Sequence, residues 1–253
     1  MKKTNFKHKT YNYLSAREAE LLNSVESLLL ISLKQVQRLT GWNVSSIKNT
    51  LHSLKNKNIL THLERNSYVL TEKIPENIFS LACVIRSPSY ISFWTACSYY
   101  GYTEQLPKTI QLVSTKQFPP LKVGEYTLDT TTFQSKNFFG YKKINHFAIA
   151  EKEKLLIEII YKPEKAGGLS EVKKCLKNMW VEINQEILLE YLHRFNNQSC
   201  FARLGYLLEE MKISNKITQE LEKNLPLGFV KLNSQRKVSN KYDQKWRINI
   251  NDQ

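Results

Sequence analysis

The sequence predicts an α+β protein in which an N-terminal winged helix-turn-helix precedes a larger, mixed α/β C-terminal domain. Three observations favour this fold class. Between Leu28 and Leu70, apolar residues recur first at helical spacing and then at the alternate spacing of strands. After residue 88, strand-like and helical segments follow one another to the end of the chain. A length of 253 residues with 42% hydrophobic residues suits two globular domains.

Capping patterns mark the first two helices of the N-terminal domain. Ser15 is followed by Glu18, and Ser32 by Gln35, which is the spacing of a capping box at a helix start. Gly41 stands where a residue with a left-handed backbone ends the second helix at little steric cost. Apolar residues at helical spacing give both helices a packing face: Ala19, Leu22, Val25, Leu33, Val36 and Leu39.

A third helix is predicted to begin after Asn43, a favourable N-cap residue, and to have two different sides. Its packing side consists of four apolar residues: Val44, Ile47, Leu51 and Leu54. Its polar side is expected to enter the major groove of double-stranded DNA with Ser45, Ser46, Lys48, Asn49 and His52. Asn49 is the foremost candidate, because an amide side chain pairs with adenine through two hydrogen bonds.

The segment after the third helix is predicted to form the wing. Residues 61–64 and Ser67–Leu70 have strand patterns, and Arg65 and Asn66 join them without the stronger Asn-Gly turn signature. We expect both turn residues to approach the minor groove or the DNA backbone. Three further cations are expected to orient the domain through phosphates: Lys34, Arg38 and Lys55.

Positive charge is concentrated in the predicted DNA-binding domain. Up to Leu70 the chain has eleven Lys and Arg residues against four Glu, a net charge of +7, which is half of the +14 of the whole chain. Clustered cations release counterions from a phosphate backbone and so favour nucleic acid as the partner. No acidic residue occurs from Val44 through Lys57, which favours a polyanion over a protein on this helix. A protein-interaction module is the alternative.

A second basic cluster lies near the C-terminus, between Lys231 and Arg247. It contains six cations and a single acid, Asp243. One hypothesis is a second DNA contact made by Arg236, Lys237 and Lys241, which would steepen the salt dependence of binding. The other is a solvated loop before the last strand.

The rest of the chain divides into a connector, residues 73–88, and a mixed α/β domain, residues 89–253; the DNA-binding domain covers residues 13–72. A buried aromatic helix is predicted over residues 90–100, ended by Gly101. Strands are predicted over residues 109–114, 126–133 and 146–150. Helices are predicted over residues 154–161, 170–180, 185–195 and 201–211. Trp246, Ile248 and Ile250 are expected to share one face of a final strand.

Several classes of protein are disfavoured. No apolar run approaches the roughly 18 residues that cross a bilayer, and the N-terminus lacks a secretion signal, so we expect a cytoplasmic protein without a membrane partner. Four separated cysteines without a Cys-x-x-Cys pair argue against a zinc site or disulfides and favour buried, reduced thiols. No other metal site and no cofactor are expected, because metal-ligand spacings and phosphate-binding glycine loops are missing.

Enzymatic activity is also disfavoured. A restriction-type nuclease needs a metal-binding acid and a Glu-x-Lys pair on a neighbouring strand. Asp129 with Glu171 and Lys173 has the required residue types. However, Glu171 and Lys173 lie in a helical pattern far downstream of Asp129. Hydrolase signatures such as Gly-x-Ser-x-Gly and His-Glu-x-x-His do not occur, so no catalytic residue is assigned.

From about Tyr13 onward the chain resembles the AbiEi family, the regulatory antitoxins of bacterial type IV toxin-antitoxin systems. The most specific segment is Arg203-Leu204-Gly205-Tyr206-Leu207-Leu208-Glu209, and the order of the segments adds weight. The other matching segments are Arg86-Ser87-Pro88-Ser89-Tyr90-Ile91-Ser92, Tyr99-Tyr100-Gly101, residues 107–115 and 150–161, Gly167-Gly168-Leu169-Ser170-Glu171-Val172 and Lys245-Trp246-Arg247-Ile248-Asn249-Ile250-Asn251.

The resemblance implies a repressor that binds its own promoter and opposes a nucleotidyltransferase-like toxin encoded beside it. In such systems the antitoxin acts without a stable complex, so direct contact with the toxin is not assumed. Family members without an evident toxin also occur. A stand-alone winged-helix regulator without antitoxin activity is therefore the second expectation.

Overall fold

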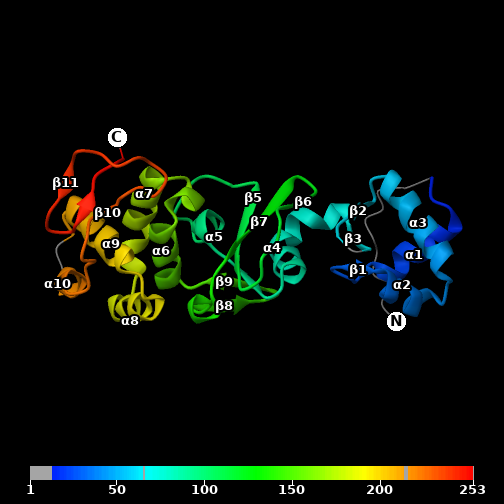
Figure 1. The fold of residues 1–253 in the computed structure, drawn as a ribbon. Helices are drawn as coiled ribbons and strands as arrows, with labels where there is room; N and C mark the ends of the chain where they lie inside the picture. Colours follow the sequence, from blue (N-terminus) through cyan, green and yellow to red (C-terminus); the bar gives the residue numbers. More distant parts are fainter. Residues whose placement is uncertain (1–12, 65, 214–215, 253) are drawn as a thin grey trace. The chain divides into compact units, whose positions relative to one another are not determined.

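The computed structural model describes residues 13–64, 66–213 and 216–252 and shows an α+β protein (Figure 1). It divides into two compact units. Unit 1 extends to Leu81 and includes Lys122–Gly124, and unit 2 comprises Ala82–Leu121 and the chain from Glu125 onward.

Up to Leu70, the described part of unit 1 contains three helices and a small antiparallel sheet of order β1-β3-β2. Strand β3 is central: Ile31 of β1 pairs with Tyr68, and Leu60 of β2 pairs with Leu70. The helices contact one another in all three pairings, which encloses an apolar core. The elements are α1 (Ala16–Val25), β1 (Ile31–Ser32), α2 (Leu33–Thr40), α3 (Val44–Asn56), β2 (Leu60–His62) and β3 (Ser67–Leu70).

Both predicted capping boxes are confirmed. The Glu18 carboxylate accepts a hydrogen bond from the Ser15 backbone N–H at 2.7 Å, while the Ser15 hydroxyl accepts one from the Glu18 N–H. Ser32 and Gln35 form the same reciprocal pair at the start of α2. These local bonds satisfy N–H groups that have no partner inside the helix.

The boundary between α2 and α3 is also set by local chemistry. Gly41 has φ 72°, a left-handed backbone that a residue without Cβ adopts easily, and it ends α2 as predicted. The Asn43 side chain accepts a hydrogen bond from the Ser46 N–H at 2.8 Å, so the predicted N-cap of α3 is confirmed. The direction of α3 is therefore fixed where the helix begins.

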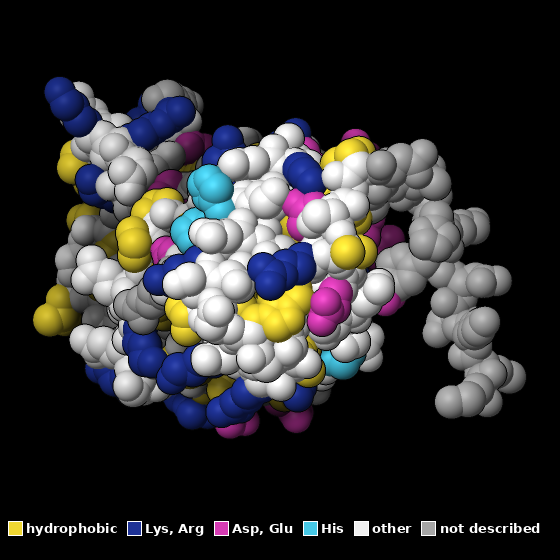
Figure 2. All heavy atoms as spheres, turned by 90° about the vertical axis from the view of Figure 1, so that its right-hand side faces the viewer, with side chains coloured by type: hydrophobic (Ala, Val, Ile, Leu, Met, Phe, Trp, Pro, Cys, Tyr) yellow, Lys and Arg dark blue, Asp and Glu magenta, His cyan; other side chains and the backbone are white. Residues whose placement is uncertain are grey.

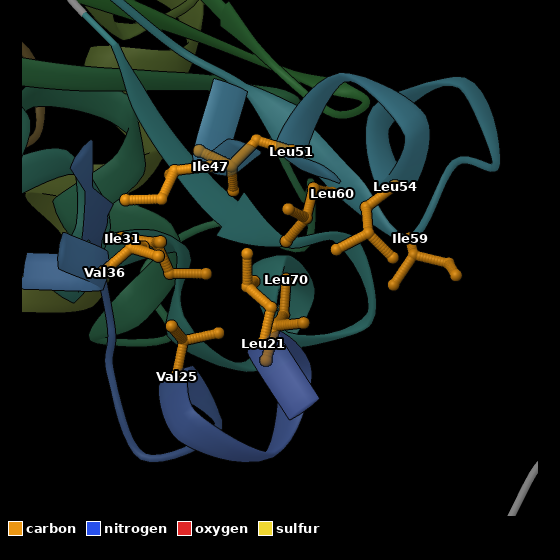
Figure 3. Packing of buried hydrophobic residues seen from close by; sticks show 10 residues of the cluster. All are labelled: Leu21, Val25, Ile31, Val36, Ile47, Leu51, Leu54, Ile59, Leu60 and Leu70. Atoms are coloured by element: carbon orange, nitrogen blue, oxygen red, sulfur yellow. The ribbon is translucent and has the colours of Figure 1, made fainter. Parts of the chain in front are cut away.

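The core of unit 1 differs in part from the predicted packing faces (Figure 3). Leu21, not Ala19, is the fully buried apolar residue at the centre of α1, and Leu22 is only partly buried beside it. Leu39 and Val44 are exposed, because they lie at the two helix ends next to Gly41, where no described element covers them. The buried side of α3 therefore consists of Ile47, Thr50, Leu51 and Leu54.

The hairpin after α3 is shorter than predicted. Strand β2 is Leu60–His62 instead of residues 61–64, because the pairing with β3 begins at Leu60 opposite Leu70. Asn66 has φ 60°, the left-handed conformation that asparagine tolerates in turns. Arg65, predicted at the tip of this turn, lies outside the described residues.

The predicted connector contains a helix, α4 (Ile74–Ile85), preceded by the 3₁₀ turn η1 (Thr71–Lys73). Pro75 is the second residue of α4, where its missing N–H breaks no intrahelical bond. Residues 90–100 are not one helix as predicted: Tyr90 lies in a strand, and the helix α5 (Phe93–Tyr99) begins only after Ser92. Tyr99, at its end, is exposed.

Unit 2 is built around a mixed sheet of order β6-β7-β5-β4-β9-β8, of which only Lys122 and Val123 of β6 are assigned to unit 1. Strands β5 and β7 pair in parallel, as do β4 and β9, whereas β4 is antiparallel to β5 and β8 to β9. The sequence analysis missed β4, β6 and β8, which have at most four residues each. The strands are β4 (Ser89–Ile91), β5 (Thr109–Ser114), β6 (Leu121–Val123), β7 (Tyr126–Thr132), β8 (Tyr141–Ile144) and β9 (Phe147–Ala150).

Helices gather on one side of this sheet (Figure 1). The central helix α6 contacts α5, α7, α8 and α9, and its apolar residues from Leu155 to Ile160 are buried. The helices are α6 (Lys152–Tyr161), α7 (Leu169–Met179), α8 (Gln185–Phe195), α9 (Gln198–Glu210) and α10 (Lys216–Glu222), with the 3₁₀ turns η2 (Ser135–Asn137), η3 (Pro163–Ala166) and η4 (Trp180–Glu182). Three of the four free cysteines are buried, and Cys83 is half-buried.

The chain ends in a small sheet of order β10-β12-β11 that belongs to unit 2. Its strands are β10 (Val230–Lys231), β11 (Tyr242–Asp243) and β12 (Ile248–Asn249). The expected alternation from Trp246 to Ile250 is wrong in part: Trp246 and Ile248 are buried, but Ile250 is half-buried and Asn249 is buried as well. Strand β12 is covered on both sides, since Asn249 binds a neighbouring loop.

Candidate nucleic-acid interface

The outer side of α3 presents a continuous set of polar residues. Successive residues of a helix are about 100° apart, so residues 44, 45, 48, 49, 52 and 55 fall within an arc of about 140°. All of the sequence-predicted residues in this arc are exposed: Ser45, Lys48, Asn49, His52 and Lys55. Ser46 is half-buried and lies outside the arc, so the structure does not bring it together with the others.

The opposite side anchors α3 in unit 1. Ile47, Leu51 and Leu54 are fully buried in the core shown in Figure 3. Polar contacts add to this anchor, because Glu18 of α1 accepts hydrogen bonds from Ser53 and Lys57 of α3, each at 2.7 Å. The hydrogen bond from Lys57 lowers the pKa of Glu18 from 4.5 to about 2. A helix fixed in this way presents its outer residues in one arrangement.

The charge on the outer side of α3 is entirely positive. Its first turn contains no acidic residue, and neither Lys48 nor Lys55 forms an ion pair within the described part of the chain. Figure 2, seen from the side on which Figure 1 draws α1 to α3, shows Lys and Arg side chains on this face together with apolar, His, and Asp or Glu side chains. Cations without acidic partners remain available to phosphate groups.

The flanking residues predicted to contact the DNA backbone or minor groove lie on three elements: α2, α3 and the β2–β3 hairpin. Lys34 is exposed in the first turn of α2, and Arg38 is exposed in its last turn. Lys55 is exposed in the last turn of α3. Asn66 is exposed in the turn of the β2–β3 hairpin.

Sequence reasoning missed two features of this surface. Val44 belongs to the exposed arc, with 41% of its surface accessible, although its apolar character suggested packing. On the hairpin, His62 and Tyr68 face each other across the strands, with ring centroids 5.0 Å apart. Val44 is recognisable only from its position as the first helical residue, and the ring pair only from the strand register.

The cations of the second basic cluster differ in the contacts that they make. Lys245 forms ion pairs with Glu209 at 2.6 Å and Glu222 at 3.3 Å. Arg247 donates a hydrogen bond to the Pro226 carbonyl at 2.5 Å. Arg236, Lys237 and Lys241 are exposed on the loop before β11 and at its end.

Two buried amides hold this loop in shape. The Asn251 side-chain amide donates hydrogen bonds to the carbonyls of Asn233, Arg236 and Lys237, at 2.8 to 3.2 Å. Asn249 donates to the carbonyls of Ser239 and Lys241 in the same way. The shape of the loop is therefore held by two side chains that follow it in the chain. A solvated tail has no such hydrogen bonds.

The residues weighed for nuclease chemistry are engaged separately. Asp129 forms an ion pair with Lys165 at 2.5 Å. Glu171 binds Lys174 at 2.6 Å, and Lys173 binds Glu210 at 2.9 Å. Among the described residues, no group of three or more His, Cys, Asp and Glu side chains is arranged to hold a metal ion.

Unit 2 contains a fully buried ion pair that the sequence analysis did not single out. Lys154 and Glu158 lie one turn apart in α6, 2.5 Å from each other, and neither side chain is exposed. Glu158 also accepts hydrogen bonds from Tyr90, at 2.5 Å, and from Ser92. Burial, followed by the charge of Glu158, raises the pKa of Tyr90 well above its usual value. The cluster has no access to solvent and binds the sheet to α6.

Segments of α9 and of the C-terminal end of unit 2 also pack against one another. The Arg203 guanidinium donates hydrogen bonds to the carbonyls of Lys231, Ile160 and Tyr161. Glu209 accepts hydrogen bonds from the Trp246 indole at 2.7 Å and from Lys245. These residues join α9 to the C-terminal segment, so their role in the structure is to hold these two parts of unit 2 together.

Comparison with solved structures reveals a neighbour of the same fold. The crystal structure of the RV2827C protein from Mycobacterium tuberculosis matches with a TM-score of 0.68 over 93% of this chain and 91% of that chain. The sequence identity is 13%, so the likeness concerns the fold alone. No family model matches the chain, and no curated protein matches it. None of the helices within the described residues is long and apolar enough to span a membrane.

Proposed function

We propose that unit 1 is a winged helix-turn-helix that binds double-stranded DNA, and that the protein is a transcriptional repressor acting on its own promoter. The observation that carries this proposal is the outer side of α3, where polar and cationic residues are exposed together without an acid. A helix fits the major groove of B-DNA, and the second helix of a helix-turn-helix normally occupies it.

Each predicted contact has a chemical role in this proposal. Asn49 reads adenine through its amide, while Ser45 and His52 reach neighbouring base edges. Lys48 contacts a base edge or a phosphate. The flanking residues position the domain on the backbone or in the minor groove: Lys34, Arg38, Lys55, Arg65 and Asn66.

The proposed biological role is that of an AbiEi-type antitoxin. Its support is the resemblance in segment order from about Tyr13 onward, together with a DNA-binding unit at the N-terminus. The functional partner is a nucleotidyltransferase-like toxin, opposed without stable contact. Co-expression with a toxin gene found beside this gene is expected to restore growth. A repressor that binds its promoter but does not restore growth is instead a stand-alone regulator.

The DNA-binding proposal is tested by fluorescence anisotropy with the full chain and its upstream duplex. Asn49→Ala is expected to weaken binding about 5- to 150-fold, because loss of a good base contact costs roughly 1 to 3 kcal/mol. The matched control is Asn23→Ala, an exposed asparagine on α1, which is expected to leave binding unchanged. Equal affinities of both variants and the unmodified protein contradict the assignment of Asn49, and no binding at low salt contradicts the proposed function.

A further inference from the structure

We infer that Val44 contacts a thymine methyl group, so that the DNA site of this protein carries a thymine opposite the first turn of α3. This inference rests on the proposed DNA-binding function. It names a residue that determines specificity and the base that this residue selects.

The position of Val44 in α3 is the first observation. It is the first residue of the helix and keeps 41% of its surface exposed, whereas Ile47, Leu51 and Leu54 of the same helix are fully buried. Side chains of a helix tilt toward its N-terminus, so the isopropyl group lies at the leading end of α3. In helix-turn-helix proteins, the N-terminal residues of this helix are the ones that meet base edges.

The second observation is the surroundings of Val44. Ser45 is its exposed neighbour in the chain, and Lys48 and Asn49 lie one turn further along the same exposed arc. On the other side, no atom lies within 4 Å of the position of a Cβ on Gly41, so the corner between α2 and α3 is open. A duplex that meets Asn49 therefore also meets Val44.

The chemistry of the major groove selects the base. A valine side chain has no hydrogen-bond donor or acceptor, so it gains nothing from the N7, O6, N4, N6 or O4 atoms of base edges. The C5 methyl group of thymine is the one apolar group that the four bases present in this groove. Contact between this methyl and the isopropyl group removes apolar surface of both partners from water.

The test removes only the methyl group. In the upstream duplex, each thymine is replaced in turn by deoxyuridine, and binding to the full chain is measured by fluorescence anisotropy. At one position in each site we expect the Kd to rise about fourfold, the worth of one buried methyl group. With Val44→Ala, the same replacement is expected to leave the Kd unchanged, since the partner of the methyl is then missing.

Leu39→Ala is the matched control. Leu39 is 54% exposed at the end of α2, so its loss also removes an exposed apolar side chain, but outside α3. This variant is expected to keep the fourfold effect of deoxyuridine. Circular dichroism is expected to show all three proteins equally folded, because neither residue is in the core.

Other outcomes overturn the inference in distinguishable ways. If deoxyuridine changes the Kd nowhere, or changes it equally for the unmodified protein and Val44→Ala, Val44 does not contact thymine, while the proposed DNA binding stands. If Val44→Ala instead changes the oligomeric state in size-exclusion chromatography without altering the deoxyuridine effect, the valine is a contact between copies. If the unmodified duplex does not bind at low salt, the proposed function fails and the inference fails with it.

Discussion

The indole of Trp246 occupies the space next to Gly205 so completely that a Cβ built on this glycine lies 1.9 Å from Cζ3 of the tryptophan. Gly205 is buried in the middle of α9, and Trp246 is fully buried in the C-terminal segment. Because Gly205 has no side chain, the large indole of Trp246 fits into the space next to it.

Gly205→Ala is expected to destabilise unit 2 strongly. Overpacking a core with one methyl group costs about 1 to 3 kcal/mol, and a contact below 2 Å with a rigid ring belongs at the upper end. The measurement is the thermal unfolding midpoint of the full chain. Gly228→Ala is the control, because Gly228 is exposed and a Cβ there meets no atom within 4 Å. Equal midpoints for both variants would show that the indole moves aside freely.

The stability of unit 1 is expected to fall on acidification because of Glu18. Its pKa is about 2 in the folded protein and 4.5 in the reference state, so the stabilisation is fully present above pH 4.5 and is lost as the pH falls toward 2. Glu18→Gln is expected to lose about 2 kcal/mol at pH 7, less than the full pKa shift corresponds to because solvent screens the Lys57 pair, and to flatten the dependence between pH 5 and 2.

Urea unfolding followed by the indole NMR signal of Trp42, the tryptophan of unit 1, measures this effect. Glu20→Gln removes an exposed carboxylate from the same helix and is the matched control. A steep acid dependence that persists in Glu18→Gln would assign the effect to other groups.

Removal of Lys154 is expected to be more harmful than removal of the whole ion pair. Lys154→Met leaves the Glu158 carboxylate buried without its cation, which costs about 3 to 5 kcal/mol. In Lys154→Met/Glu158→Gln, the amide oxygen still accepts a hydrogen bond from Tyr90, and most of the stability is expected to return. Urea unfolding of the three proteins measures the difference. A double variant as unstable as the single one would contradict this account.

Charge reversal at Arg236 and Lys237 tests the proposed second DNA contact. If both side chains contact phosphates, Arg236→Glu/Lys237→Glu makes the negative slope of log K against log salt less steep by about 2. Lys136→Glu/Lys177→Glu changes the net charge equally at other exposed positions of unit 2 and is expected to keep the slope. An unchanged slope in the first variant would assign the loop to solvent.

Features that depend on residues close together in the chain could be predicted from the sequence. The two capping boxes, the Asn43 cap and the left-handed Gly41 each involve side chains and backbone groups within a few positions. The ends of β5 and α8 were predicted for the same reason, because strong apolar patterns are bounded by turn residues. The exposed side of α3 follows from helical periodicity once its buried side is known.

Features that depend on distant partners could not be predicted. Periodicity assigns Val44 to the packing side, but whether an end of a helix is covered depends on what lies beside it. The spacing of Lys154 and Glu158 is typical of an exposed pair, and only the surrounding sheet and helices make it a buried one. No sequence pattern around Asn249 and Asn251 predicts that they bind five backbone carbonyls, since those carbonyls lie eight to eighteen residues earlier in the chain.

The dependence of the loop at Arg236 and Lys237 on the asparagines that follow it has a consequence for biosynthesis. During translation the loop is made before Asn249 and Asn251, so five of its carbonyls lack these side-chain partners until the last strand has been made. This surface is therefore completed only once these two residues have been made, after the helices of unit 1 have had time to fold. A chain without the residues from Asn249 onward would therefore keep every residue of the unit 1 core, while its basic loop at Arg236 and Lys237 would lose five hydrogen bonds.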